Sequence, residues 1–376
     1  MGQPIDKITL KGFKSIRSLE DFPLRSLNIL IGANGAGKSN FVDFFRLLRA
    51  MAEERLQRFI LEHGGPDGFF FMGPKYTPRV SAHLEFGPDT YEFSLAPTSS
   101  GELMVEEERV HGAGENSAGP LTYAWPGGTR ESVVFVECRY EGTPNVGQYL
   151  GDVRRSVYES VSSWIVFHFH DTSMLAPMRR TGSVRDNEYL RPDAGNLAAF
   201  LLMLRDQHQC AYEKIRDIVR LAAPFFDDFK FRPKPSNGDT TLQLEWTQKG
   251  SDYPFLVTQL SDGTLRFIAL TTALLQPNPP STILLDEPEL GLHPYALTLL
   301  AELLKKAATK TQVIVSTQSA SLLDNFEAED VIVVEREDGA STFKRLSSVE
   351  LQEWLKDYSL GELWEKNIFG GRPSNG

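Results

Sequence analysis

The chain has 376 residues, 41% of them hydrophobic and 24% charged, a composition typical of a folded globular protein and not of a disordered one. Its net charge of −11 has the wrong sign for a protein that coats duplex nucleic acid by bulk electrostatics. Only two cysteines occur, far apart and without the spacings of a zinc site. No apolar run approaches the ~20 residues of a membrane span and the first residues lack a signal-peptide core, so we expect a cytoplasmic protein with no membrane partner.

The N-terminal part of the chain predicts a strand followed by a helix. Residues 5–31 alternate loosely between apolar and polar side chains and end in the mostly apolar segment Leu27–Ile31, which predicts a buried strand. Apolar residues then recur at helical spacing from Ser39 onward. The sequence His63-Gly64-Gly65 ends this pattern, so the predicted helix ends there.

The next part of the chain predicts an antiparallel meander. Short segments of strand-forming residues are separated by Gly, Pro, Asp and Asn. These segments are Arg79–Phe86, Thr90–Leu95, Leu103–Val110 and Val133–Cys138. The stretch 112–119 is polar and rich in glycine, which indicates a loop.

Residues 155–225 are expected to be mainly helical around a short strand, Trp164–Phe169, with amphipathic helices at Leu197–Leu204 and Ala211–Leu221. No heptad pattern persists, which argues against a long coiled-coil arm. A hairpin at 228–247, turning at residues 236–238, is predicted to follow.

From residue 258 the predicted elements alternate between helix and strand. A helix is expected from Thr264, a strand at Thr282–Leu285, a helix from Pro294 and a strand at Gln312–Ser316. Such alternation favours a parallel sheet with helices packed on it. A last helix, around Leu351–Tyr358, is expected to cover an edge.

Residues 32–39 match the pattern G-x-x-x-x-G-K-[ST] at every fixed position, between the first predicted strand and the first predicted helix. Backbone N–H groups of such a loop converge on phosphates, and the helix N-terminus adds its positive end. Lys38 is expected to reach the β- and γ-phosphates, and Ser39 to ligate Mg²⁺. The loop residues of the predicted ATP site are Gly32, Ala33, Asn34, Gly35, Ala36 and Gly37.

Two carboxylates end the apolar strand at Thr282–Leu285. At the carboxyl edge of a parallel sheet Asp286 can hold Mg²⁺, directly or through water, as in P-loop ATPases. Glu287 can orient or deprotonate the attacking water. An ordinary surface pair is the alternative, which the apolar strand before it disfavours.

The segment Leu260-Ser261-Asp262-Gly263-Thr264 begins the next predicted helix with small residues suited to an anion. Taken alone, the segment is better explained as an ordinary helix N-cap.

These three segments, in this order, resemble the ATP-binding-cassette ATPases of the SMC/RecF/OLD branch: GANGAGKSN as Walker A, LSDGT as the signature and ILLDEPELGLHP as Walker B. Residues 11–16, 191–197 and 313–319 also look like this branch, and the resemblance spans nearly the whole chain. The overall sequence is similar to those of stand-alone bacterial ATPases without a coiled coil or a fused nuclease. The fold implied is an α/β ABC-type ATPase head, with a parallel core sheet, an antiparallel β-meander and a helical signature lobe.

The resemblance also implies how the head is organised. Lobe I would comprise about residues 1–150 and 275–376, and lobe II about residues 151–274. By the same resemblance, Lys14 and Asn40 are expected to contribute to nucleotide binding. Ser261 and Gly263 would complete the nucleotide site of a second copy, so a homodimer with two ATP molecules is expected. Relatives suggest DNA, or a separately encoded effector or nuclease, as a further partner.

The switch position after the strand at 312–316 departs from this resemblance. It is Gln318 here, whereas the superfamily usually has histidine. A glutamine amide can donate to the γ-phosphate but cannot become cationic, so we expect slow turnover. A nucleotide-sensing ATPase that no longer hydrolyses is the alternative. No glutamine in the region 69–73 fits the Q-loop of the family.

Three histidines each allow a structural and a functional interpretation. His293 lies in the loop after Walker B, which lines the dimer interface in the family, and is equally well explained as a helix-start residue before Pro294. His168 and His170, with Asp171 next, could face one side as metal ligands. A structural pair is the simpler interpretation, because no other residue at metal spacing accompanies them in the sequence.

Two other classes of protein remain open. A transporter's nucleotide-binding subunit shares the fold, although Asn34, Asn40 and the LSDGT signature fit the SMC/RecF side better. A scaffold that binds ATP and signals to a partner without hydrolysis is the second.

Overall fold

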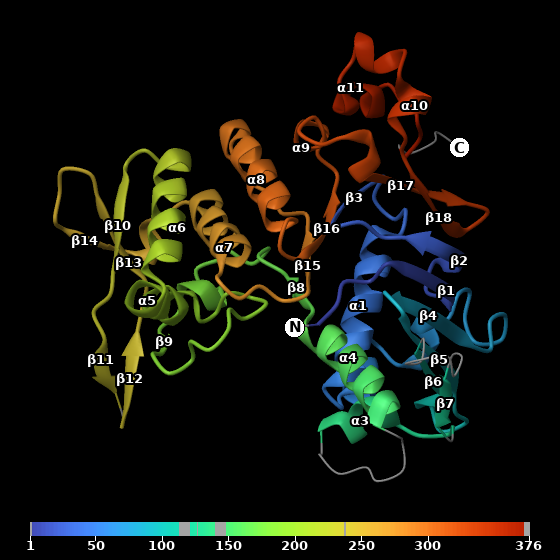
Figure 1. Cartoon of the computed structure of the whole chain (residues 1–376). Helices are drawn as coiled ribbons and strands as arrows, with labels where there is room; N and C mark the ends of the chain where they lie inside the picture. Colours follow the sequence, from blue (N-terminus) through green and yellow to red (C-terminus); the bar gives the residue numbers. More distant parts are fainter. Residues whose placement is uncertain (1, 113–120, 126, 140–147, 237, 372–376) are drawn as a thin grey trace.

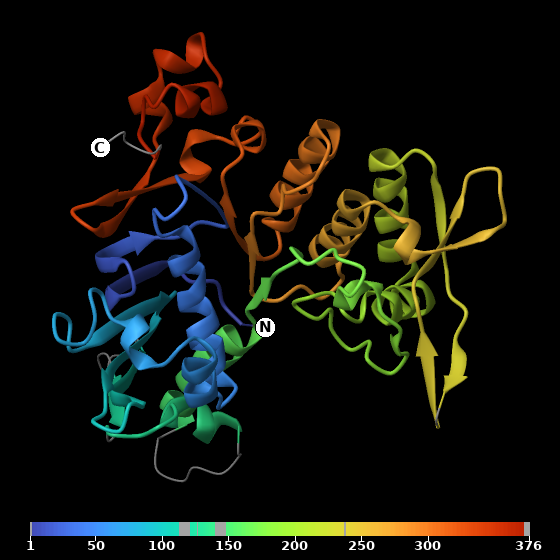
Figure 2. The same cartoon turned by 180° about the vertical axis from the view of Figure 1, so that it is seen from behind.

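The computed structural model describes residues 2–112, 121–125, 127–139, 148–236 and 238–371. Two six-stranded sheets and a helical lobe organise these residues. Figures 1 and 2 show the core sheet at the centre, with the outer sheet on one side and the helical lobe on the other. The predicted turn residue Asn237 and all but the first residue of the predicted loop 112–119 lie outside the described residues.

The core sheet has the strand order β18-β17-β3-β16-β15-β8, and all its strands except β18 run parallel. Their bounds are β3 (Leu27–Ile31), β8 (Ile165–Phe167), β15 (Thr282–Asp286), β16 (Gln312–Thr317), β17 (Val331–Glu337) and β18 (Ala340–Arg345). Alternate residues of one strand enter two different cores, as Leu284 packs in one and Leu285 in the other. Because both faces are covered, the central strands β3, β16, β15 and β8 are mostly apolar.

The outer sheet is the predicted antiparallel meander, in the order β2-β1-β4-β5-β6-β7. Its strands are β1 (Lys7–Phe13), β2 (Ile16–Pro23), β4 (Val80–Phe86), β5 (Asp89–Pro97), β6 (Leu103–Gly112) and β7 (Leu121–Trp125). Strand β4 alternates strictly between buried and half-buried residues, so one face of the sheet meets the core. Helix α1 (Lys38–Ala52) shares this core through Phe44, which stacks on Phe93 of β5.

The helical lobe contains α5 (Leu197–Gln207), α6 (Gln209–Ala222) and α7 (Asp262–Leu275), with two small sheets on its far side. The sheets have the orders β10-β13-β14 and β11-β12-β9. Their strands are β9 (Gly182–Ser183), β10 (Phe226–Lys230), β11 (Lys234–Ser236), β12 (Asp239–Leu242), β13 (Glu245–Gln248) and β14 (Pro254–Leu256). The predicted hairpin is confirmed, because β11 pairs antiparallel with β12 across the predicted turn.

The remaining helices lie outside this lobe. They are α2 (Leu56–Glu62), α3 (Val133–Arg139), α4 (Gln148–Ser163), α8 (Pro294–Ala307), α9 (Ala320–Leu323), α10 (Ser348–Leu351) and α11 (Leu360–Glu365). Single 3₁₀ turns lie at Pro66–Phe69, Pro177–Arg179, Val257–Gln259, Ala328–Asp330 and Trp354–Lys356. The described residues contain no helix that is both long and apolar enough to cross a membrane.

The predicted strand Val133–Cys138 is wrong, because these residues belong to helix α3. The helix begins where Glu108, a buried carboxylate, accepts its first two backbone N–H groups at 2.9 and 3.2 Å. The Ser132 hydroxyl accepts a third at 3.2 Å. The long-range Glu108 contacts and the local Ser132 cap satisfy the helix start and override the strand preference of a valine-rich segment.

Two helix boundaries also differ from the predictions. The helix predicted from Ser39 to residue 63 is divided into α1 and α2, because Glu54 adopts a left-handed φ of 57°. The N–H of Arg55 then donates to Ala50 O at 2.8 Å, which closes a Schellman-type helix end. The single helix predicted at Leu351–Tyr358 is instead the end of α10 followed by a 3₁₀ turn.

Candidate nucleotide-binding site

The loop between β3 and α1 has glycine where only glycine fits. A β-carbon on Gly32 would lie 2.2 Å from Val334 O of the neighbouring strand β17. Gly37 has a φ of 118°, and a β-carbon there would lie 2.0 Å from Ser341 Oγ. Gly35 also has a positive φ, 79°, and lies exposed together with Asn34. The loop is therefore held tightly at both ends while its middle is open to a ligand.

Lys38 and Ser39 begin helix α1 at this loop. The Lys38 side chain is 5% exposed, and its Nζ donates to Gly32 O at 2.7 Å and to Ala33 O at 3.1 Å. Burial lowers the pKa of Lys38, and the carboxylates of Glu287 and Asp286 act against that shift. Ser39 is exposed at the helix start. The positive charge of Lys38 therefore lies inside the loop, where phosphates are expected to bind.

The carboxyl ends of the parallel strands bring the other predicted residues to the same edge. Asp286 pairs in register with Ser316, the second-last residue of β16, and Thr317 pairs with Ile31, the last residue of β3. Glu287 follows with a φ of 42°, a strained conformation for a side chain with a β-carbon, and its N–H donates to Ser316 O at 2.7 Å. Lys38 and both carboxylates therefore meet at the carboxyl edge of the core sheet.

Gln318 contacts the residue expected to act as the base. Its side-chain Nε2 donates a hydrogen bond to Oε1 of Glu287. The switch loop itself is held by Glu289, whose Oε1 accepts from Thr317 Oγ1 at 2.6 Å and from the Gln318 backbone N–H at 3.0 Å. Burial raises the pKa of Glu289, and these hydrogen bonds oppose that shift. The role of Glu289 was not predicted from the sequence, because its side chain contacts Thr317, which lies 28 residues further along the chain.

Lys14 and Asn40 lie beside the loop and not within it. The Lys14 ammonium is paired with Asp43 at 2.6 Å, and Asn40 donates to Ser15 Oγ at 2.6 Å. Both residues line a cavity of about 420 Å³ that Phe71 and Arg336 also border. This cavity adjoins the phosphate loop, since Arg336 Nη1 donates to Gly35 O at 3.4 Å.

The signature segment lies away from the loop of its own chain. Ser261 is exposed and caps α7, accepting the Thr264 N–H at 3.2 Å, so the N-cap interpretation is confirmed for the single chain. A β-carbon on Gly263 would lie 2.3 Å from Gly291 O, so a close approach to the loop after Walker B requires this glycine. In Figures 1 and 2, β15, β16 and α8 separate α7 from α1.

Arg266, one turn into α7, links the signature helix to the sheet edge. Its guanidinium donates to the carbonyls of Phe169 at 2.9 Å and His170 at 3.2 Å, and also to Leu290 O. Burial lowers its pKa. His293 caps α8 through Nδ1, which accepts the Tyr295 N–H at 3.3 Å, so its helix-start interpretation is confirmed.

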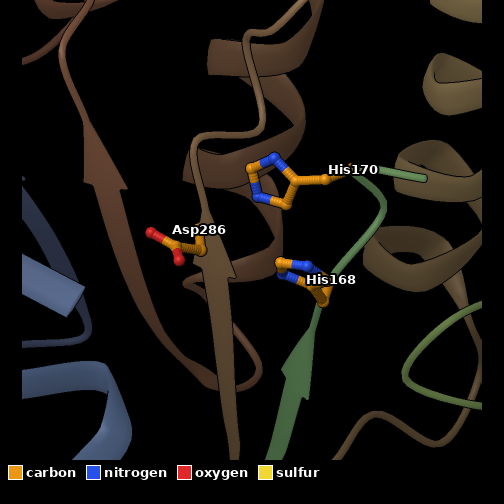
Figure 3. A group of neighbouring side chains, drawn as sticks. All are labelled: His168, His170 and Asp286. Carbon is orange, nitrogen blue, oxygen red and sulfur yellow. The ribbon is translucent and has the colours of Figure 1, made fainter. Parts of the chain in front are cut away.

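The segment after β8 adds residues that the sequence predictions left as a structural pair. Strand β8 lies next to β15, and the segment after it carries His168 and His170 to the edge where Asp286 lies (Figure 3). Burial lowers the pKa of His168, and His170 and Arg46 lower it further. Asp171, also considered from the sequence, is not part of this group, since it accepts the Ser173 N–H at 3.0 Å.

A parallel core sheet, a phosphate loop and two carboxylates at its edge define the class of protein, a P-loop ATPase with an ABC-type head. The family described as "AAA domain, putative AbiEii toxin, Type IV TA system" matches residues 27–108 and 155–324, and the chain belongs to it. Membership implies ATP binding. The chain is thus an ATPase of the SMC/OLD branch, and the resemblance expected from its motifs is confirmed.

Individual relatives are consistent with this assignment. An OLD nuclease of Thermus scotoductus is 23% identical over 359 residues, which cover 89% of this chain and 63% of that protein. The structure of an SMC head bound to the C-terminal winged-helix domain of ScpA is 16% identical, with a TM-score of 0.59 over 93% of this chain and 99% of that one. An SMC head of Pyrococcus furiosus has a TM-score of 0.51 at 17% identity, covering 94% and 99% of the two chains. These structures confirm the predicted fold.

Proposed function

We propose that this chain is an ATP-hydrolysing molecular switch that closes as a homodimer around two nucleotides. The observation that carries the proposal is the meeting of Lys38, Glu287 and Gln318 at one sheet edge, while the exposed Ser261 lies on a separate lobe. The first group supplies what phosphoryl transfer to water needs on one side of the nucleotide. The signature segment is left without a nucleotide site in its own chain.

The phosphate loop would hold the phosphates through residues 32–37, and the adjoining cavity of about 420 Å³ suits the nucleoside. Lys38 would leave the carbonyls of Gly32 and Ala33 for the β- and γ-phosphates. The oxygen donors of Ser39 and Asp286 fit Mg²⁺, a hard cation that prefers oxygen ligands. When bound, Mg²⁺ would neutralise charge that develops on the phosphate oxygens.

Glu287 is the proposed base that orients the attacking water and accepts its proton. Gln318 would donate to the transferred phosphoryl group, which requires it to leave the Glu287 carboxylate. Because the amide stays neutral, the charge it can stabilise is limited, and we expect slow turnover. The same contact favours a second candidate, a scaffold that senses nucleotide with little hydrolysis.

Two variants test the dimer. Glu287→Gln should bind ATP with Mg²⁺, fail to hydrolyse it and accumulate as a dimer in light scattering. Ser261→Arg should bind ATP equally well but remain a monomer without turnover, because the new side chain blocks the partner's phosphates. A monomeric Glu287→Gln, or unchanged turnover in Ser261→Arg, would remove the trans site from the proposal.

We further propose that the switch is coupled to DNA maintenance, DNA repair or phage defence, on the strength of the relative named as a nuclease and the SMC likeness. Phosphate release with and without DNA tests this coupling, with Lys38→Ala as the inactive control. Stimulation by DNA supports it, whereas its absence favours a protein effector as the partner. Lack of any phosphate release with intact ATP binding would favour the scaffold.

A further inference from the structure

A mixed group of nitrogen and oxygen donors lies at the carboxyl edge of the core sheet. The side chains of His168, His170 and Asp286 each offer one ligand atom, and these atoms all lie within 4.8 Å of one another. Figure 3 shows both imidazole rings projecting from the segment after β8 toward the strand that carries Asp286. Among the described residues, this is the group of His, Cys, Asp and Glu side chains that could hold a metal ion.

One buried nitrogen of this group lacks a hydrogen-bond partner among the described residues. Nε2 of His170 is buried, yet it has no hydrogen-bond partner within the described part of the chain. A buried polar atom without a partner is unfavourable, because it has lost its hydrogen bonds to water and gained none from the protein. The neighbouring ring does not supply this partner, since the two imidazoles are tilted by 41° with centroids 4.3 Å apart and no hydrogen bond joins them among the described contacts. A ligand that accepts electron pairs from both rings would satisfy this arrangement.

The backbone that carries the two imidazoles is fixed from several directions. The His168 N–H donates to Pro192 O at 2.9 Å. Arg266 of the signature helix holds the carbonyls of Phe169 and His170. Ligands on a braced segment lose little freedom when an ion binds, which favours binding.

We propose that His168, His170 and Asp286 form a binding site for a divalent transition-metal ion such as Zn²⁺ or Co²⁺. Two imidazoles and a carboxylate are donors that these ions prefer, whereas Mg²⁺ prefers oxygen alone. Donor atoms about 2.0–2.2 Å from a metal lie at most about 4.4 Å apart, so small side-chain rotations close the set. Three protein ligands leave a fourth, open position for water.

Sharing of Asp286 makes this site a regulator of the nucleotide site, a consequence that rests on the proposed function. The same carboxylate is the proposed ligand of nucleotide-bound Mg²⁺. An ion held by the two histidines draws the Asp286 carboxylate toward β8, so the transition metal and Mg²⁺-ATP should weaken each other's binding reciprocally.

The direct test is a titration of the nucleotide-free chain with Co²⁺ and Zn²⁺, by visible absorption and by calorimetry. The wild type should bind one ion per chain, with a Co²⁺ spectrum that indicates nitrogen ligands. His168→Ala/His170→Ala should lose at least about tenfold in affinity. The matched control His63→Ala/His208→Ala removes two imidazoles from outside the group and should bind as the wild type does.

Equal affinity in the wild type and the His168→Ala/His170→Ala variant, or no ion bound by the wild type, would overturn the metal site. Lys38→Ala separates this outcome from the proposed function, because it should abolish ATP binding and leave metal binding intact. Loss of ATP affinity on addition of Zn²⁺ to the wild type, but not to the histidine variant, would support the sharing of Asp286. An ATP affinity indifferent to Zn²⁺ in both proteins would refute it.

Discussion

Arg266 offers a quantitative test of how the signature helix is joined to the sheet edge. Substitution by methionine keeps most of the apolar stem and removes the guanidinium, which leaves the carbonyls of Phe169, His170 and Leu290 without that donor. At about 1 kcal/mol for each lost hydrogen bond, Arg266→Met should lower the free energy of unfolding by about 3 kcal/mol. Removal of the buried charge, whose pKa is lowered by burial, acts against this loss and makes the figure an upper bound.

Urea unfolding followed by tryptophan fluorescence measures the change. Arg180→Met is a matched control, because Arg180 is exposed and donates to one carbonyl, that of Leu175, at 2.7 Å. The control should change stability by less than about 0.5 kcal/mol. If Arg266→Met unfolds at the same urea concentration as the control, the guanidinium does not join the signature helix to the sheet edge, and the reasoning is refuted.

Further predictions concern the switch loop and the signature glycine. Gln318→Ala should slow phosphate release by about tenfold or more with ATP affinity unchanged, and unchanged release would dismiss its role as donor. Burial raises the pKa of Glu289 above 4.5, so its stabilising contribution is present below the unfolded pKa and lost as the pH rises through the folded one. The stability of the wild type relative to Glu289→Gln should therefore rise as the pH falls from neutrality toward the ordinary glutamate value of 4.5, and a flat difference in urea unfolding would contradict this sign. Gly263→Ala should cost about 1–3 kcal/mol, because its β-carbon would lie 2.3 Å from Gly291 O, whereas Gly151→Ala, in open space on a helix, should cost nothing. Equal melting temperatures for the two glycine variants would show that the close approach is relieved without cost.

The elements that local pattern defines could be predicted from the sequence. Buried strands such as Leu27–Ile31 and Thr282–Asp286 are short, mostly apolar runs; a phosphate loop follows the first, and the carboxylate pair lies at the end of the second. The parallel sheet followed from the alternation of these strands with helices, and parallel strands place their carboxyl ends at one edge. The grouping of Lys38 with Asp286 and Glu287 could therefore be predicted from the sequence.

The features that distant contacts create could not be predicted in this way. Helix α3 depends on Glu108, which lies 25 residues before the first N–H that it accepts. The grouping of His168 with Asp286 depends on the pairing of β8 with β15, and nothing in either segment specifies this neighbour. Strands β17 and β18 are different, because they pair locally as an antiparallel hairpin, and they were not predicted.

The central claim is that each nucleotide site is built from two chains, and mixing two inactive variants tests it most directly. Lys38→Ala lacks the lysine proposed to bind phosphate and Ser261→Arg lacks the proposed signature serine, so each variant alone should release no phosphate. Only a mixed dimer can form an intact site, which joins the phosphate loop of the Ser261→Arg chain to the signature segment of the Lys38→Ala chain, and each mixed dimer has one such site out of two. Phosphate release should therefore recover in the mixture, to at most about half of the wild-type rate. A mixture that stays as inactive as its components would contradict the shared site.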